Sequence, residues 1–328
     1  MKAPKILIVS TDSDAHLRPV CEELDRKNIP WIQFCPENLP YYNTLTYKFG
    51  GGKDNFILSG KLVNSKKEKI EIENIRSVWF RRSLSHKINP DLQEKGIIEF
   101  AKKEAQNSLI WLCKILPCRW INNPIQMQYI KQKSYQLKIA SELGFKIPKS
   151  LITNDPNDVI SFFKECKGQV AIKPLSPPAV ATDDGVCGLY THKLKKEDLL
   201  HINFVKYAPC FLQEYIHKKN ELRITVVGDK TFSCEIGSQT REDAKYDWRS
   251  SSEVLSLPHK IIKVPNEIEK KCLNLTKRLG ILFGAIDIIK TPNNQYVFLE
   301  INPNGQWLWI EELTGAKISS AIAELLGN

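Results

Sequence analysis

Short apolar runs alternate with an amphipathic stretch at the start of the chain. Apolar side chains dominate 5–10 and 30–35, and residues 14–28 between them follow the spacing of a helix with one buried face. Strand, helix and strand in this order are typical of the opening of a parallel α/β layer.

The same pattern continues through the first third of the chain. A strand is predicted at 77–83, where the motif VWFRR ends in a pair of arginines, and a long helical pattern covers 90–116. A further short strand at 119–123 is followed by Asn-Pro, which is a stop signal. We therefore predict an N-terminal parallel α/β domain over 1–123.

A second unit begins after this stop. The pattern at 126–144 is helical and ends in Gly144, and the apolar run QVAIKP predicts a buried strand with Lys173 near its end. Residues 176–188 read as a loop. These elements predict a central domain over 124–207.

The remaining residues favour antiparallel strands. Two apolar-rich runs at 221–236 flank Gly228-Asp229, which is a good hairpin signal. On the first of them Glu221 and Arg223 share one face, opposite an apolar face. A salt-bridged pair on a surface hairpin is the alternative explanation for these two residues. We predict a C-terminal antiparallel domain over 208–328.

A second hairpin carries the strongest candidate chemistry. If Asn293-Asn294 is its two-residue turn, Asp287 lies directly opposite Glu300, and Asn302 shares the face of Glu300. Two facing carboxylates repel unless a cation lies between them, and oxygen ligands on paired strands suit Mg²⁺ that holds phosphates. The alternative is a solvated edge hairpin with unrelated acids.

Composition narrows the class of protein. The chain has 328 residues, a net charge of +10 and nine cysteines with no CxxC pair. An odd number of scattered cysteines is typical of a protein with reduced thiols, and no long apolar segment suggests export or a membrane, so we expect a cytoplasmic location.

The charge indicates an anionic partner, but no basic run is interleaved with aromatics, which argues against nucleic acid. Gly50-Gly51-Gly52 lacks the Lys and Ser/Thr of a Walker motif.

The order of the short motifs resembles the ATP-grasp superfamily. The series QEYI, ELR, VVGD, DWR, IDI and LEIN is similar to that of ribosomal-protein glutamate ligases. VWFRR near the start and LEINPNGQWLWIEELTG near the end resemble graspetide synthetases, the ATP-grasp maturases of microviridin-type peptides. This resemblance covers nearly the whole chain. It implies an α/β (α+β) ATP-grasp fold with ATP bound between the central and C-terminal domains.

The resemblance also implies roles for particular residues. Those assigned to ATP are Lys133 and Lys173 at the phosphates, the hinge Gln213, Glu214 and Tyr215 at adenine, and Glu221 at the ribose. Those assigned to the reaction are Arg223, Arg249 and Arg241 as guanidinium clamps, with Mg²⁺ on Asp287, Glu300 and Asn302. Lys131 is a rival to Lys133, Glu214 fits a surface acid, and Arg241 fits an ordinary ion pair.

The reaction implied is carboxylate activation by ATP, followed by capture of the acyl phosphate. The substrate expected is a ribosomal precursor peptide with a leader and an acidic, Thr/Ser-containing core, whose Asp or Glu side chains are joined to hydroxyls as ω-esters. Lactam formation with Lys, a small carboxylate–amine ligase and a non-enzymatic nucleotide-binding protein are the alternatives. Relatives that dimerise suggest a homodimer.

Two further expectations concern peptide binding. The family's phosphate-covering loop is glycine-rich, whereas 176–188 has only Gly185 and Gly188, so loop closure is expected to depend on bound peptide. The leader is expected to dock away from the chemistry, between a helix at 155–166 and the lysines of 193–196.

Overall fold

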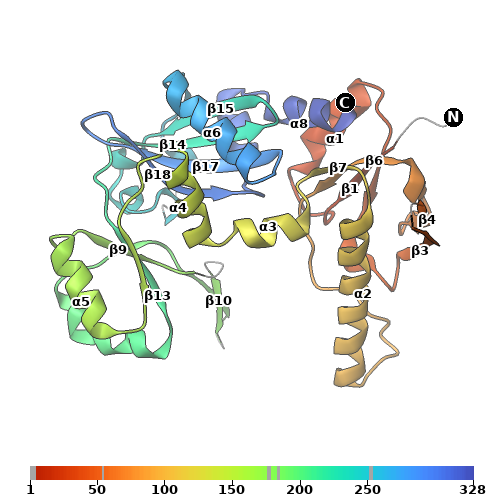
Figure 1. The fold of residues 1–328 in the computed structure, drawn as a ribbon, viewed down its shortest axis with the longest axis horizontal. Coiled ribbons are helices and arrows are strands. Elements are labelled where there is room, and N and C mark those ends of the chain that lie inside the picture. The colour runs from red at the N-terminus through yellow and green to blue at the C-terminus, as the bar shows by residue number, and fades with distance from the viewer. Residues whose placement is uncertain (1–4, 54, 176–178, 183–184, 251–253) are drawn as a thin grey trace.

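The computed structural model describes residues 5–53, 55–175, 179–182, 185–250 and 254–328, and its chain forms three units (Figure 1). A parallel α/β unit lies on the right of the view, and a central sheet and a C-terminal sheet lie on the left, one below the other. This arrangement is the α/β (α+β) class predicted from the sequence.

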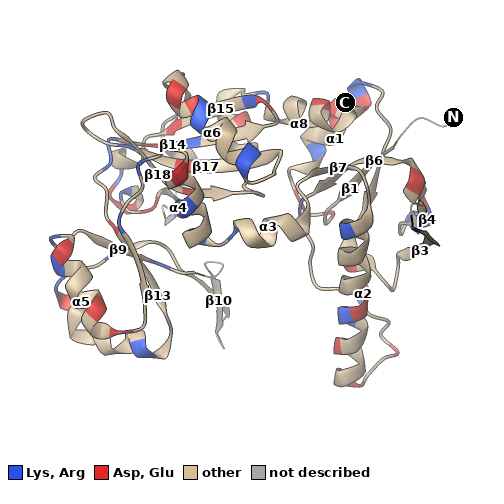
Figure 2. Ribbon diagram, in the orientation of Figure 1, with Lys and Arg blue, Asp and Glu red and all other residues tan. Residues whose placement is uncertain are grey.

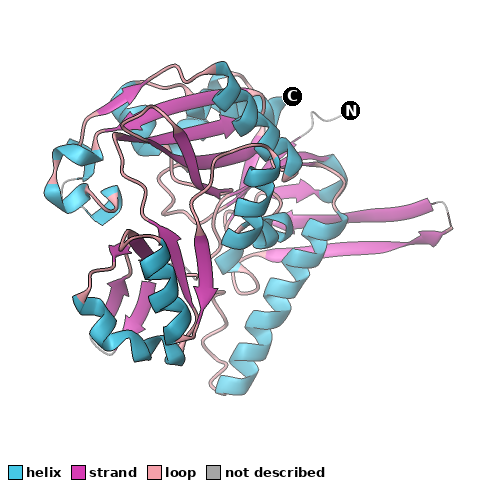
Figure 3. Cartoon of the chain, turned by 60° about the vertical axis from the view of Figure 1, so that its left-hand side comes forward, coloured by secondary structure: helices cyan, strands magenta, loops and turns pink. Residues whose placement is uncertain are grey.

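The N-terminal unit is built on a four-stranded parallel sheet of order β2-β1-β6-β7. Its elements are β1 Lys5–Val9, α1 Leu17–Arg26, β2 Trp31–Phe34, β3 Thr44–Gly52, β4 Asn55–Val63, β5 Lys69–Glu71, β6 Ile75–Phe80, α2 Lys95–Ile115 and β7 Arg119–Ile121. The predicted helix at 14–28 is α1, which buries Leu17, Val20 and Leu24 at helical spacing. Strands β3 and β4 form a long hairpin that projects from the unit (Figure 3), so the three glycines lie at its tip and not at a phosphate.

The central unit carries a four-stranded antiparallel sheet of order β12-β9-β13-β8. Its elements are α3 Pro124–Ile130, α4 Lys133–Glu142, β8 Ser150–Thr153, α5 Pro156–Glu165, β9 Val170–Lys173, β10 Ala179–Thr182, β11 Gly185–Gly188, β12 His192–Lys193, a 3₁₀ segment Glu197–Tyr207 and β13 Cys210–Glu214. Helices α2, α5 and α6 each carry both basic and acidic residues (Figure 2).

Three details of the central unit differ from the sequence prediction. The helix predicted at 126–144 is two helices, α3 and α4, which pack against the C-terminal sheet. The loop predicted at 176–188 contains a hairpin, because β10 pairs with β11, although 176–178 and 183–184 lie outside the described residues. Strand β13 pairs with β8 and β9, so the boundary predicted at 207/208 divides a hydrogen-bonded sheet.

The C-terminal unit is a five-stranded antiparallel sheet of order β16-β15-β14-β17-β18. Its elements are β14 Asn220–Val227, β15 Lys230–Ile236, β16 His259–Ile261, α6 Asn266–Arg278, β17 Phe283–Lys290, β18 Tyr296–Asn302, α7 Leu308–Thr314 and α8 Ile318–Gly327. On β14 the residues Leu222, Ile224 and Val226 enter the core beneath α6, as the alternation predicts. The opposite face is left for polar side chains.

The N-terminal and C-terminal units share one hydrophobic core in which α1 packs against α8. Asn122, at the end of β7, joins the two units through hydrogen bonds. Its amide nitrogen donates to the carbonyls of Phe283 (2.7 Å) and Pro303 (2.6 Å). Its amide oxygen accepts from the backbone N–H of Leu282 (2.9 Å) and Phe283 (3.1 Å). One buried side chain therefore holds the start of β17 and the residue that follows β18, the two strands that carry the site.

Replacing this side chain is expected to weaken the junction strongly. Asn122→Ala leaves four buried backbone groups without partners, which costs about 3–5 kcal/mol. The midpoint of thermal unfolding, measured by scanning calorimetry, should therefore fall by roughly 6–15 °C. Asn293→Ala in the exposed β17–β18 turn is the control. An equal, small shift for both variants would show that Asn122 does not hold the junction.

Candidate active site

The predicted pair Asp287 and Glu300 is confirmed as a cross-strand pair on β17 and β18. The predicted turn is wrong: Thr291 N–H donates to Gln295 O (2.9 Å), which leaves a three-residue loop in place of two. Below this loop Ile288 pairs with Phe298, and the register shifts between Ile288 and Asp287. A β-bulge at Leu299 therefore restores the predicted pair.

The bulge also shapes the site. A β-bulge places two residues of one strand opposite one residue of its partner and redirects their side chains. Leu299 and Glu300, consecutive in sequence, both line the same pocket together with Asp287. An apolar wall and a carboxylate are thereby presented side by side.

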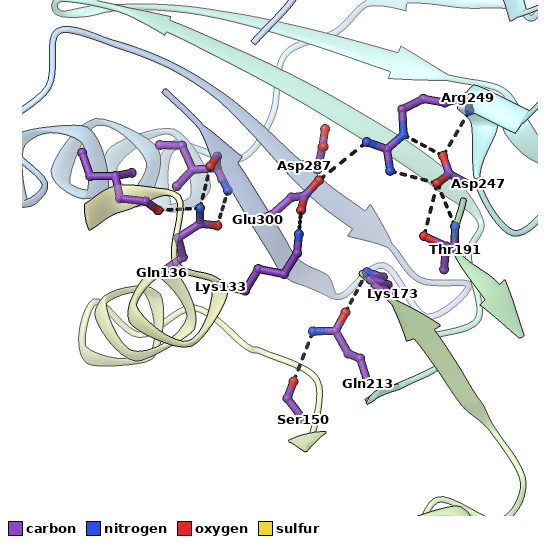
Figure 4. Close-up of polar contacts among 12 residues, drawn as sticks. Lys133, Gln136, Ser150, Lys173, Thr191, Gln213, Asp247, Arg249, Asp287 and Glu300 are labelled. Carbon is purple, nitrogen blue, oxygen red and sulfur yellow. Dashed lines mark hydrogen bonds and ion pairs between the residues drawn. The ribbon is translucent and has the colours of Figure 1, made fainter. Parts of the chain in front are cut away.

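Both carboxylates are paired with cations from other elements, and Figure 4 shows the partners of Glu300. Asp287 accepts from Arg223 Nη1 at 2.8 and 2.9 Å, since β14 is the other neighbour of β17. Glu300 accepts from Lys133 Nζ at 2.5 Å, and its second oxygen lies 3.9 Å from Arg249 Nη1. Four segments distant in sequence thus meet at one charge cluster.

The two carboxylates titrate in opposite directions. Burial raises the pKa of Asp287, and the neighbouring Glu300 adds to this, while Arg223 and Arg249 oppose it. Burial also acts to raise the pKa of Glu300, but Lys133, Arg249 and Lys173 together hold it below its usual range. Glu300 is therefore the more readily ionised member, and a further cation between the two would favour ionisation of Asp287.

Lys173 lies at the end of β9 and faces the same pocket. Its Nζ donates to Gln213 Oε1 at 2.9 Å, and Gln213 Nε2 donates to Ser150 Oγ at 3.2 Å. Burial lowers the pKa of Lys173 to about 8, which Glu300 opposes and Lys133 reinforces. A buried lysine with this environment is suited to an anionic ligand.

The other end of the pocket is formed by the hinge after β13. Glu214 and Tyr215 line it, and Lys193 Nζ lies 4.6 Å from the centroid of the Tyr215 ring. Glu221 accepts from Lys218 Nζ at 2.8 Å, and both side chains are buried. This end is a partly apolar slot in which Lys218 holds the carboxylate of Glu221.

Arg249 is held rigidly by a residue whose role the sequence analysis did not assign. Asp247 accepts from Arg249 Nε and Nη2, both at 2.8 Å, and from Thr191 Oγ1 at 3.2 Å. Burial acts to raise the pKa of Asp247, but the Arg249 guanidinium holds it well below its usual range. The guanidinium is thus fixed at the pocket wall.

Gln136 is a second residue that the sequence analysis missed. Its amide donates to Ile301 O (2.9 Å) and accepts from Ile301 N–H (3.0 Å), so it fastens α4 to β18. Lys133 lies one helical turn earlier and meets Glu300, one residue before Ile301. The spacing of Gln136 from Lys133 was the available signal.

Four predicted site residues lie outside the pocket lining. Lys133 and Arg223 contact its carboxylates, Glu300 and Asp287. The other two are Arg241 and Asn302. Arg241 Nε donates to Asp243 at 3.1 Å, and its side chain is 36% exposed. Asn302 is exposed, and its Oδ1 accepts from Asn304 N–H at 2.9 Å. Their proposed roles stay predictions.

The remaining set fits a nucleotide with Mg²⁺. The described part of the chain has no cluster of three His, Cys, Asp or Glu side chains that could hold a metal ion by themselves. Mg²⁺ does not need such a cluster, because it commonly binds one or two carboxylates plus phosphate oxygens and water. Arg223 Nε is buried without a hydrogen-bond partner among the described residues. An unpartnered guanidinium donor beside two carboxylates suits a phosphate ligand.

Comparison with known proteins decides the family. The RimK-like ATP-grasp domain model matches residues 130–326, and the MvdD pre-ATP-grasp domain model matches 5–128. The chain belongs to the RimK-like ATP-grasp family. The resemblance drawn from the motifs is thus confirmed, and so is the ATP-grasp fold. The pocket between the central and C-terminal sheets lies where the resemblance places ATP.

Solved structures of similar proteins cover the whole chain. A Chryseobacterium gregarium RiPP-associated ATP-grasp ligase, in complex with ADP and a leader and core peptide, is 31% identical, with a TM-score of 0.90 over 98% of this chain and 96% of that one. The macrocyclase MdnC of Microcystis aeruginosa MRC, bound with precursor peptide MdnA, is 29% identical, with a TM-score of 0.83 over 98% and 99%.

A curated relative is more distant. The α-aminoadipate–LysW ligase LysX of Sulfolobus acidocaldarius is 22% identical over 192 residues, which are 56% of this chain and 64% of the relative. The match thus spans less than two thirds of the length of this ligase. Among the described residues, no helix is both long and apolar enough to cross a membrane.

Proposed function

We propose that this ATP-grasp ligase is a peptide macrocyclase. It activates Asp or Glu side chains of a ribosomal precursor as acyl phosphates and joins them to Thr or Ser hydroxyls as ω-esters. The observation that carries the proposal is the 31% identity, over nearly the whole chain, with a ligase solved in complex with leader and core peptides. The match of residues 5–128 to the MvdD pre-ATP-grasp domain supports it.

The chain's own residues divide the work on ATP. Lys133 and Lys173 supply compact cations for the phosphates, and the hinge at Glu214 and Tyr215 forms the slot for adenine, with Glu221 placed for the ribose. Asp287 and Glu300, with Asn302 as the third predicted ligand, would hold Mg²⁺, which neutralises phosphate charge when it is bound.

The arginines serve the transferred group. In such a transfer a substrate carboxylate oxygen bonds to the γ-phosphorus as the bond to ADP breaks. The acceptor hydroxyl then attacks the acyl carbon, loses its proton and releases phosphate. Arg223 pairs with Asp287 and Arg249 lies 3.9 Å from Glu300, so both offer planar donors to phosphoryl oxygens at the charge cluster. Their fixed geometry aligns the reactants, which is most of what phosphoryl transfer requires.

The test incubates the enzyme with ATP, Mg²⁺ and candidate acidic, Thr/Ser-containing peptides and reads the products by mass. Each bond formed should remove the mass of one water, and mild alkali should restore it. A mass loss that survives alkali would assign lactam formation instead. No modification of the peptide, with ligation of a free amino acid, would assign a small-molecule ligase.

Nucleotide affinity is expected to depend on pH through Lys173. The folded pKa of about 8 is below the ordinary 10.5, so the apo protein loses this cation as pH rises through 8, and its stability rises between these two values. ADP affinity should therefore fall up to about tenfold per pH unit above 8. Calorimetric titration from about pH 7 to about pH 9 measures it.

Variants separate this lysine from general charge effects. Lys173→Met should weaken ADP binding at neutral pH and remove the pH dependence, whereas Lys138→Met on the exposed face of α4 should change neither. An unchanged affinity in Lys173→Met would make the lysine structural.

A leader site remote from the chemistry is the next prediction. The proposed dock lies between α5 and the lysines that follow β12, although Lys193 itself faces Tyr215 at the nucleotide slot. A second docking site raises the effective concentration of the core. The full precursor should therefore be processed faster than the isolated core at every salt concentration. Equal rates would refute the dock.

Sedimentation tests the homodimer that we propose from the relatives.

A further inference from the structure

The N-terminal sheet has a topological switch point. The strand order is β2-β1-β6-β7, so the chain leaves β1 for a neighbour on one side and leaves β6 for a neighbour on the other. In open parallel sheets, ligands bind outside the carboxyl ends of the two strands at such a point. Here those ends are the residues that follow β1 and β6.

An open pocket of about 300 Å³ lies at this place. One wall comes from the segments after β1 and β6, with Ser13, His16 and Arg82. The other wall comes from the start of α7, with Leu308, Trp309 and Glu312. VWFRR and NPNGQWLWIEELTG, the two motifs that most resemble graspetide synthetases, therefore both contribute to one pocket, and the residues that line it have no assigned role at the nucleotide.

The two arginines of VWFRR have different environments. Arg81 is buried; its Nε donates to Asp14 (3.2 Å) and its Nη1 to Asn304 Oδ1 (2.8 Å), so it ties the units together. Asp14 is fully used, since it also accepts from His16 Nδ1 at 2.9 Å and Ser10 Oγ at 3.1 Å. Arg82 lies 4.0 Å from Asp14 and is 46% exposed. Within the described part of the chain it donates no hydrogen bond, so its guanidinium is available.

Two neighbouring tryptophan rings lie between the pocket and the charge cluster of Asp287 and Glu300. The rings of Trp309 and Trp248 are 5.1 Å apart, and Trp248 lines the nucleotide pocket. The guanidinium carbon of Arg223 lies 5.9 Å from the centroid of the Trp248 ring. A peptide that places one side chain at Arg82 therefore runs along Trp309 toward the phosphate end of the nucleotide site.

We propose that this pocket binds an acidic side chain of the precursor core, with its carboxylate on Arg82 and its methylenes against Trp309. Arginine matches a carboxylate with two parallel hydrogen bonds, and such a pair specifies geometry as well as charge. Anchoring one acid here sets which other acid of the core reaches Arg223 and Arg249. Glu312 on the rim opposes a second carboxylate, so the pocket selects one side chain. The inference rests on the proposed peptide substrate.

The first experiment measures the effect of Arg82. Arg82→Gln should raise KM for an acidic peptide that the wild-type enzyme modifies on the order of 10- to 100-fold, because one charge-assisted pair is lost. Calorimetric ADP affinity and the thermal midpoint should stay unchanged, since Arg82 is partly exposed and, among the residues that the structure describes, makes only a 4.0 Å ion pair with Asp14. Arg82→Lys should recover only part of the loss. Arg18→Gln on α1, an arginine that is 86% exposed, is the control and should leave KM unchanged.

The second experiment pairs the residue with its ligand. Each core Asp or Glu is replaced singly by Asn or Gln, and binding to the enzyme with ADP is measured for wild type and Arg82→Gln. The substitution at one peptide position should weaken binding to the wild-type enzyme and have no further effect on binding to Arg82→Gln. Equal KM values for wild type and Arg82→Gln would refute the proposed pocket but not the proposed function. The same holds if the effects of Arg82→Gln and of every peptide substitution on binding are fully additive. A wild-type enzyme that neither binds nor modifies any acidic peptide would instead remove the proposed function.

Discussion

Glu300→Gln is expected to reduce product formation by at least about a thousandfold. The carboxylate meets both Lys133 and Arg249, at 2.5 and 3.9 Å, and it is a proposed ligand of Mg²⁺. Removing its charge leaves these cations and Lys173 facing one another without the ionised acid that separates them. Loss of one electrostatic contact in a preorganised site typically costs a factor of 10²–10³, and this variant disturbs the metal and two cations together.

The measurement is the rate of peptide mass loss at saturating ATP, with the thermal midpoint recorded in parallel. Asp287→Asn should act similarly, and its amide oxygen can still accept one of the two hydrogen bonds that Arg223 donates to Asp287. Glu267→Gln, which removes a carboxylate that is 75% exposed on α6, should leave the rate unchanged. Near-normal turnover in either site variant, with the fold intact, would refute the metal assignment.

Local sequence patterns were sufficient for the strands that carry the site. The polar face of β14 follows from period-two alternation, and the pairing of Asp287 with Glu300 was predicted by counting outward from the turn. The pair was nevertheless predicted from the wrong turn, because a three-residue loop and a bulge at Leu299 shift the register in opposite directions. Nothing in the composition of these residues signals the bulge, since it depends on what both faces of the strand must contact.

Contacts between distant segments were beyond such patterns. Lys133 and Glu300 are separated by 167 positions, and Arg81 and Asn304 by 223. Only the assembled fold shows that Arg81 is a structural clamp whereas its neighbour Arg82 faces a pocket. The motif order identified the family, but the side-chain partners that orient Arg249 and Lys133 required the structure.

Arg249→Met is expected to lower product formation on the order of 10²–10³-fold while changing ADP affinity less than about threefold. The guanidinium is fixed by two hydrogen bonds of 2.8 Å to Asp247, which Thr191 holds in turn. A donor fixed in this way stabilises charge that develops on the transferred phosphoryl and acyl groups, since it needs no reorganisation during the reaction. The loss should therefore appear in kcat.

Asp247 and Arg241 sharpen the interpretation of that result. Asp247→Asn keeps the guanidinium but loosens its orientation, so it should retain more activity than Arg249→Met, and the double variant should be no worse than Arg249→Met alone. Arg241→Gln, measured beside them, decides whether the third predicted arginine belongs to the site, because Arg241 contacts Asp243 and lies outside the pocket lining. Full additivity of the Asp247 and Arg249 substitutions would mean that the carboxylate acts independently of the guanidinium, which would contradict its positioning role.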